Sequence, residues 1–287
     1  MLQFNAEDFV VENNEEQAFR LNPRMSGTFF LKKTFCIVTG ASQGYGASLA
    51  EKFASLLPAN SALLLLARNA DKLKGVTEKI HCQSPDVSVH FHKFDQSVLQ
   101  ECSTENLRTI INKSNISPSD FEQCIIIHNA GVIGDVTKFT WQIKDAEMVD
   151  HAMKVNVTGA ILVNTAFMEC CDGTESMAII NVSSLAAIQP FSSWSIYCAG
   201  KAARDMYFQV VATEKEAVRV LNWGPGPLDT DMQARCRECA DDNIRQYFTD
   251  AYKQGKLLSC EESADKLVIV LDRNDYKSGS HIDVYDV

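Results

Sequence analysis

The chain has 287 residues, of which 46% are hydrophobic, enough for one large α/β domain with a sizeable core or for two small domains. Its formal net charge is −10 and it has no long basic run, so nucleic acid and anionic membrane surfaces are poor candidates for its main partner. No apolar run approaches the length of a transmembrane helix.

The first 26 residues are predicted to form a polar, flexible tail, with a single domain over residues 27–287. The tail is acidic, which opposes both a signal peptide and a mitochondrial presequence. The ten cysteines are irregularly spaced; Cys236 and Cys239 form one CxxC, but no second pair or nearby histidine completes a zinc site. We therefore expect free thiols, no bound metal and a cytoplasmic location.

Short apolar runs alternate with helical patterns from residue 34 onward. Strands are predicted at 34–39, 61–67, 87–94, 124–131, 177–184, 218–223 and 281–286. Helices are predicted at 45–57, 70–80 with Asn69 as the cap, 97–111, 145–170, 194–214 and 263–271. Continuously apolar strands alternating with helices are typical of a parallel sheet covered on both faces. We predict one doubly wound, Rossmann-type α/β domain with a seven-stranded, mostly parallel sheet.

Residues 229–254 interrupt this alternation, because they contain no predicted strand and carry mixed helical signals. Such an insertion beside the active edge of a sheet is suited to a substrate lid.

A glycine-rich turn, TGASQGYG, joins the first predicted strand to the first helix. Gly40, Gly44 and Gly46 would let the backbone approach a pyrophosphate at the N-terminus of that helix. About twenty residues later, an NAD site usually places an acidic side chain for the ribose 2′-hydroxyl. This chain has Arg68 there, which attracts a 2′-phosphate, so the pattern favours NADP(H). The alternative is a solvated arginine at a strand end.

Tyr197 and Lys201 stand four residues apart and share one face of a predicted helix. An ammonium beside a phenol favours the phenolate, so we expect Lys201 to lower the pKa of Tyr197 from its reference value of about 10 toward neutrality. Such a tyrosine can give a proton to a carbonyl oxygen. Taken alone, the pair could equally be an aromatic core residue and a surface lysine.

Together these motifs resemble the short-chain dehydrogenase/reductase family. The matching stretches are TGASQGYG, HNAG at 128–131, Asn156 in KVNVTG, NVSS at 181–184, YCAGK at 197–201 and GPGPLDTDM at 224–232. The resemblance runs from the first predicted strand nearly to the C-terminus, about nine-tenths of the chain. The longer runs NVSSLAAIQPF, YCAGKAARDMYFQV, PGPLDTDMQ and KSGSHIDVYD resemble more closely those family members that reduce the side-chain carbonyls of pterins with NADPH in tetrahydrobiopterin biosynthesis.

The resemblance implies a role for each matching residue. The implied catalytic residues are Ser184, Tyr197, Lys201 and Asn156. The implied cofactor-binding residues are Gly40, Ser42, Gln43, Gly44, Tyr45, Gly46, Arg68, Asn69, Asp95, Gln96, Asn129, Lys201, Leu228, Thr230 and Met232. The implied substrate-binding residues are Ser184, Leu185, Tyr197, Gly226 and Asp283, with Asp283 as the anchor of the pterin ring. The resemblance also implies a homodimer.

The chain departs from the family pattern at two positions. His128 replaces an asparagine, and we expect it to be a hydrogen-bonded packing residue. Gln43 stands where a basic residue often precedes the second glycine. Binding of the 2′-phosphate would therefore depend more on Arg68. Two alternatives to a pterin reductase stay open: a broad reductase of diketones and quinones, which would not need Asp283, and a non-enzymatic NADP(H) sensor, which would not need an intact Tyr197 and Lys201.

Overall fold

The computed structural model describes residues 27–287, and the tail predicted for residues 1–26 lies outside them. Within the described residues, seven strands form one sheet in the order β3-β2-β1-β4-β5-β6-β7, and every neighbouring pair is parallel. The strands are β1 (Thr34–Thr39), β2 (Ala62–Ala67), β3 (Ser88–Lys93), β4 (Gln123–His128), β5 (Ser176–Val182), β6 (Val218–Gly224) and β7 (His281–Asp283). The predicted Rossmann-type fold is confirmed, with a sheet that is wholly parallel.

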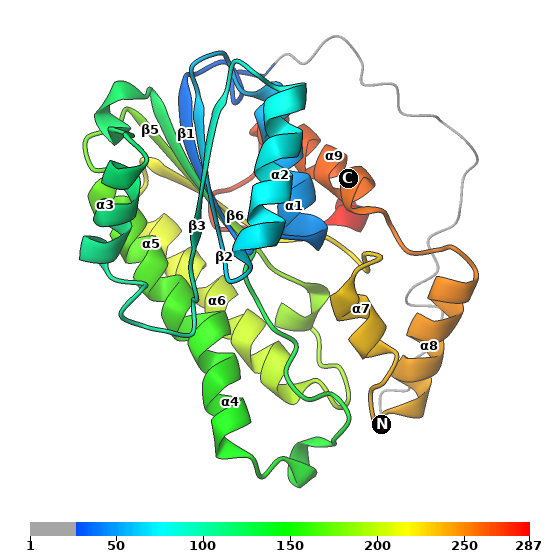
Figure 1. Ribbon diagram of the computed structural model, residues 1–287. Helices are drawn as coiled ribbons and strands as arrows, with labels where there is room; N and C mark the ends of the chain where they lie inside the picture. The colour runs from blue at the N-terminus through cyan, green and yellow to red at the C-terminus, as the bar shows by residue number, and fades with distance from the viewer. Residues whose placement is uncertain (1–26) are drawn as a thin grey trace.

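The helices cover both faces of this sheet and its carboxyl edge (Figure 1). They are α1 (Gly44–Leu56), α2 (Ala70–Gln83), α3 (Thr104–Lys113), α4 (Ala146–Met153), α5 (Gly159–Cys170), α6 (Ser195–Glu214), α7 (Asp231–Cys236), α8 (Asp242–Lys253) and α9 (Cys260–Arg273). Helices α1, α2 and α9 lie on one face, and α3, α5 and α6 lie on the other. None of the described helices is both long and apolar enough to pass through a membrane.

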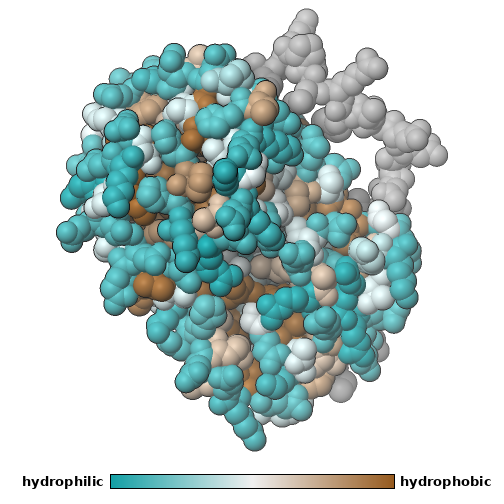
Figure 2. All heavy atoms as spheres, in the orientation of Figure 1, coloured by the Kyte–Doolittle hydropathy of each residue, from teal (hydrophilic) through white to brown (hydrophobic). Residues whose placement is uncertain are grey.

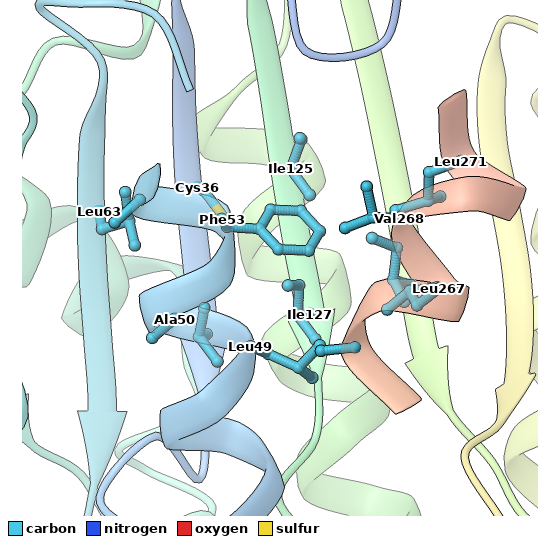
Figure 3. Packing of buried hydrophobic residues seen from close by; sticks show 14 of the residues in the cluster. Cys36, Leu49, Ala50, Phe53, Leu63, Ile125, Ile127, Leu267, Val268 and Leu271 are labelled. Atoms are coloured by element: carbon cyan, nitrogen blue, oxygen red, sulfur yellow. The ribbon is translucent and has the colours of Figure 1, made fainter. Parts of the chain in front are cut away.

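The core forms because the strands bury residues on both faces. Phe53 of α1 packs between the sheet and α9, where it lies beside Ile125 of β4 and Val268 of α9 (Figure 3). All three side chains are almost completely buried. Burying a large apolar side chain contributes about 1.5–3 kcal/mol, so this layer fixes α1, and with it the glycine-rich turn, against the sheet.

The predicted helix at 97–111 was wrong at its start, because α3 begins at Thr104. The carboxylate of Asp95 accepts hydrogen bonds from the backbone N–H and the hydroxyl of Ser97, at 2.9 and 2.7 Å. These local bonds hold the segment in a turn instead of a helix. The hydroxyl of Ser103 then caps α3 by accepting from the N–H of Asn106.

The long helix predicted at 145–170 is divided by one π-helical turn, η4 (Lys154–Thr158). There the N–H of Gly159 bonds the carbonyl of Lys154 instead of that of Val155. The side-chain amide of Gln96 takes over the carbonyl of Val155, at 2.7 Å. Such π turns are frequent at functional sites, and this one contains Asn156.

Candidate active site

A cleft of about 1460 Å³ opens at the carboxyl ends of the strands. Pockets for one small ligand usually measure about 300–1,000 Å³, so this cleft has room for a dinucleotide and a second molecule. Hydrophobic residues gather in the middle of the face shown in Figure 2, surrounded by hydrophilic ones. Every site residue predicted from the sequence lines the cleft, except Gly46 and Asn156.

The glycine-rich turn takes the shape that its glycines allow. Gly40 and Gly44 have φ angles of 68° and 54°, a region that favours glycine. A Cβ atom on Gly46 would lie 2.3 Å from the carbonyl oxygen of Gly40, so Gly46 lets α1 approach the turn. The first turn of α1 has no acidic residue, and its N-cap, Gln43, makes no side-chain cap. The N-terminus of α1 therefore keeps N–H groups and a positive dipole end for an anion.

Asn129 ties the end of β4 to this turn. Its side-chain amide donates to the carbonyls of Thr39 and Gly40, both at 3.2 Å. The hydroxyl of Tyr45 is bonded on the other side, by the indole N–H of Trp223 at 2.8 Å and by the Ser263 hydroxyl at 3.1 Å. The loop is thus fixed by the protein itself.

The ends of β2 and β3 supply the polar residues at the far end of the cleft. Asn69 caps α2, where its side-chain oxygen accepts from the N–H of Lys72 at 3.0 Å. Burial opposes the ionisation of Asp95, but hydrogen bonds from Ser97 and the charge of Arg68 lower its pKa below the usual value. Gln96 keeps a buried side-chain oxygen that has no hydrogen-bond partner in the described part of the chain.

Ser184, Tyr197 and Lys201 meet at the centre of the cleft. Ser184 follows β5, and its side chain is hydrogen-bonded to the Tyr197 hydroxyl. Lys201 is almost fully buried one turn further along α6, and its ammonium donates to the carbonyl of Val182 at 2.6 Å. The ammonium nitrogen lies 5.6 Å from the centroid of the Tyr197 ring. This arrangement places a hydroxyl pair and a cation at one point of the cleft.

The predicted direction of the Tyr197 pKa was wrong. Burial raises the pKa of Tyr197, and the Ser184 hydrogen bond and the Arg204 charge only partly oppose it. Burial also lowers the pKa of Lys201 well below its usual value, and the nearby charge of Arg204 adds to this shift. The Lys201 ammonium is bonded to the Val182 carbonyl, and burial sets the direction of the Tyr197 pKa.

Asn156 is buried behind the cleft instead of lining it. Its side-chain amide forms two hydrogen bonds with the backbone of Val132, accepting from the N–H at 2.9 Å and donating to the carbonyl at 2.8 Å. Asn156 therefore holds the loop after β4 against the π turn. A Cβ atom on Gly131 would lie 3.3 Å from the Asn156 side-chain oxygen and 3.9 Å from the Lys201 ammonium, so these groups surround one glycine.

Asp283, at the end of β7, lines the cleft beside Gly226 and Leu185. Burial raises the pKa of Asp283, and the neighbouring Asp286 adds to that shift. One carboxylate oxygen accepts from the N–H of Tyr285 at 3.2 Å. Gly226 has a φ of 76°, and a Cβ there would lie 2.7 Å from Val284. A bulkier residue at this position would collide with Val284 and would be strained at this φ.

Leu228, Thr230 and Met232 line the cleft from the segment that leads into α7. The hydroxyl of Thr230 caps α7 by accepting from the N–H of Gln233. Helices α7 and α8 make up most of the 229–254 insertion (Figure 1). Its role as a lid stays a prediction.

A family model described as short chain dehydrogenase matches residues 34–241. The chain belongs to this family. It is 37% identical to the sepiapterin reductase of Rattus norvegicus, over 88% of this chain and 96% of the relative, and 38% identical to that of Xenopus laevis, over 89% and 97%. The resemblance to pterin-reducing family members is therefore confirmed as a similarity to sepiapterin reductases.

More distant relatives share the same fold. A benzil reductase ((S)-benzoin forming) of Bacillus cereus is 27% identical over 86% of this chain and 98% of the relative. Among solved structures, the enzyme KRED1-Pglu covers 87% of this chain and 100% of its own, with a TM-score of 0.71 and 23% identity. A short-chain dehydrogenase of Shigella flexneri complexed with NADP covers 90% and 99%, with a TM-score of 0.70 and 22% identity.

As a member of the short-chain dehydrogenase family, the protein is an oxidoreductase that uses a nicotinamide dinucleotide. The cleft fits such a group in two respects: the uncapped N-terminus of α1 suits a pyrophosphate, and Gln96 keeps a buried oxygen that is unpaired among the described residues. Within the described residues, no group of three or more His, Cys, Asp or Glu side chains is arranged to hold a metal ion.

Lys72 is a cleft residue that the sequence reasoning missed. It lies in the first turn of α2, and its ammonium donates to the side-chain oxygen of Gln43. Gln43 in turn donates to Asp231 of α7 at 3.0 Å. A basic residue placed four positions after Arg68 was the available signal. Gln43 itself is uncharged, but the Lys72 ammonium lies beside it and supplies a positive charge at this place.

His128, the other departure from the family pattern, is a packing residue. It is buried, its ring lies 5.0 Å from that of Phe208, and one ring nitrogen is 3.2 Å from the Asn164 side-chain oxygen. Burial lowers the pKa of His128 to about 3, so the ring is neutral at cellular pH. It does not line the cleft.

Proposed function

We propose that the protein uses NADPH to reduce the side-chain carbonyls of pterins, sepiapterin and 6-pyruvoyl-tetrahydropterin, in tetrahydrobiopterin biosynthesis. The observation that best supports this proposal is the identity of 37% to rat sepiapterin reductase over 88% of the chain. The cleft is consistent with it, because the Ser184–Tyr197–Lys201 group and the Asp283 carboxylate line the same space.

NADPH, when bound, supplies the hydride. Tyr197 gives its hydroxyl proton to the substrate carbonyl oxygen. Ser184 donates a hydrogen bond to the same oxygen and stabilises its developing negative charge. Lys201 binds the nicotinamide ribose and positions Tyr197. Asn156 fixes the loop after β4 and supports the return of protons to Lys201.

The substrate ring is held at the other end of the cleft. A pterin presents a 2-amino group beside a ring N–H, an edge that a carboxylate grips with two hydrogen bonds, and Asp283 is the acceptor we assign. Trp194 lines the cleft in a stack with Phe191 and Phe248, with ring centroids 5.2 and 5.3 Å apart. This aromatic wall suits a planar ring, and holding the ring orients the side-chain carbonyl for reaction.

The direct test is to mix the protein with NADPH and sepiapterin and to follow the loss of the yellow pterin absorbance. We expect turnover that depends on NADPH. Binding of NADPH without reduction of sepiapterin or of a small diketone would favour the sensor alternative instead.

We also propose that the cofactor is NADP(H), with its 2′-phosphate between Arg68 and Lys72. Both residues line the cleft near the N-terminus of α2.

We expect Arg68→Asp to weaken NADPH binding by about 10-fold or more and to shift preference toward NADH, since a charge-assisted hydrogen bond contributes about 1.5–3 kcal/mol. We expect Lys72→Gln to weaken NADPH binding less, with NADH binding unchanged. Fluorescence titration of both nucleotides measures this, and Lys74→Gln, which lies off the cleft, is the control. Unchanged NADPH affinity in the Arg68 variant would contradict the assignment.

A broad diketone reductase is the second candidate, and the benzil reductase of Bacillus cereus is the observation that favours it. The aromatic wall would hold an aryl ring as well as a pterin. Asp283 separates the two candidates, because a small diketone has no edge with two N–H donors for it to bind.

We further propose a homodimer built on α5 and α6. Met206, Val210 and Leu162 are exposed hydrophobic residues on these helices, at 60%, 44% and 37% of their possible surface. Light scattering during size-exclusion chromatography is expected to give twice the mass of the chain, and Met206→Glu is expected to shift the protein toward the monomer.

A cytoplasmic location is consistent with the ten cysteines, all of which are free thiols.

A further inference from the structure

A buried polar cluster lies behind the Asp283 end of the cleft. Its centre is Asp205 of α6, one of whose carboxylate oxygens accepts from the Asn181 side-chain amide at 2.9 Å and from the Ser183 hydroxyl at 2.5 Å. The other oxygen is 2.6 Å from Nδ1 of His281 in β7. Because a carboxylate only accepts hydrogen bonds, Nδ1 is the donor in this pair. Asp205 therefore fixes the orientation of the His281 ring through a proton on Nδ1.

The second ring nitrogen of His281 is then directed toward Asp283. The two residues are two apart in β7, so their side chains lie on the same face of the sheet. A Cβ atom on Gly224 of the neighbouring strand would lie 2.6 Å from a carboxylate oxygen of Asp283 and 3.3 Å from Nε2 of His281. Nε2 is buried and has no hydrogen-bond partner among residues 27–287. The space that Gly224 leaves open is thus shared by an imidazole nitrogen and the cleft carboxylate.

We infer that His281, held by Asp205, is a positioning residue that keeps Asp283 in its charged form for binding an N–H-rich substrate edge. In the doubly protonated ring, Nδ1 donates to Asp205 and Nε2 presents an N–H and a positive charge to Asp283. This inference rests on the proposed pterin reduction and adds a residue that the reduction of a carbonyl does not itself require.

The charges around Asp283 make such a residue useful. Burial and Asp286 both favour the neutral carboxyl, which presents an O–H donor to the N–H edge in place of one acceptor oxygen. Opposing them are the hydrogen bond from the Tyr285 N–H, then His281 of β7 and Lys266 of α9. Lys266 also donates to the carbonyls of Val284 and Val287, at 2.9 and 3.1 Å. Tyr285 is the remaining titratable neighbour, and burial raises its pKa to about 12, so it stays neutral. His281 is therefore the neighbour whose second ring nitrogen is left without a partner among the described residues and can face Asp283.

The test is the pH profile of kcat/KM for sepiapterin in the variant His281→Asn. The asparagine amide can still donate to Asp205 in place of Nδ1, but it lacks Nε2. His281 lowers the pKa of Asp283, so without it that pKa rises further and the loss of the carboxylate on acidification begins at higher pH. We expect the acid limb to move up by about one pH unit, because a nearby opposite charge lowers a carboxyl pKa by about 1–3 units. Low on the acid limb this is a loss of up to about 10-fold, and at pH 8 we expect little change.

Three controls separate this inference from a loss of structure and from failure of the proposed function. NADPH binding and diketone reduction should be unchanged in His281→Asn, and His90→Asn on β3 should leave the pH profile as it is. In an Asp283→Ala background, His281→Asn should have no further effect on sepiapterin, because the two residues act as one unit. A loss that is equal at all pH values, or that adds to that of Asp283→Ala, would overturn the inference alone. A protein in which Asp283→Ala leaves sepiapterin turnover intact would overturn the pterin anchor as well.

Discussion

Tyr197→Phe is expected to lower kcat for sepiapterin by about 10²- to 10⁴-fold, the usual contribution of general acid catalysis. The substitution keeps the ring, which is 93% buried beside Trp194, and removes only the hydroxyl that bonds Ser184. Burial keeps the hydroxyl in its protonated form, which is the form that a proton donor needs. Stopped-flow or steady-state rates with saturating NADPH measure the loss.

A matched control is available on the same helix. Tyr207 lies on α6 outside the cleft, and its hydroxyl accepts from Asn164 at 3.3 Å. Tyr207→Phe removes a hydroxyl of the same kind and should leave kcat within about 2-fold, because the lost hydrogen bond contributes only about 1 kcal/mol to stability. NADPH affinity should be unchanged in both variants. Near-normal turnover in Tyr197→Phe would contradict the proton-donor role.

Asp283→Ala is expected to lower kcat/KM for sepiapterin by about 10²-fold or more while changing reduction of a small diketone little. The carboxylate is half-buried in the cleft, and each charge-assisted hydrogen bond to the substrate contributes about 1.5–3 kcal/mol. Asp283→Asn is the graded variant: it keeps one acceptor oxygen and the shape, so its loss should be smaller.

The informative quantity is the ratio of the two losses in kcat/KM. A general disturbance of the cleft lowers kcat/KM for both substrates, because both react at Ser184, Tyr197 and the nicotinamide site. A loss confined to sepiapterin supports the pterin anchor. Equal losses for sepiapterin and the diketone would make the broad reductase the better description.

Much of the fold and of the reaction centre follows from the sequence because the information is local. The apolar strand at 34–39, the glycine turn after it and the four-residue spacing of Tyr197 and Lys201 each depend on residues that are close in the chain. Periodicity and glycine placement report backbone geometry directly. The order of the elements then required a parallel sheet whose carboxyl edge gathers these motifs.

Only the tertiary structure decided how distant groups modify one another. Gln43 meets Asp231 across 188 positions of the chain, and His281 meets Asp205 across 76. The pKa of Tyr197 moves opposite to the direction predicted from its spacing to Lys201, because burial outweighs the neighbouring charge. Spacing along a helix shows which side chains are neighbours. The degree of desolvation, and the partner that takes each hydrogen bond, depend on how separate elements pack.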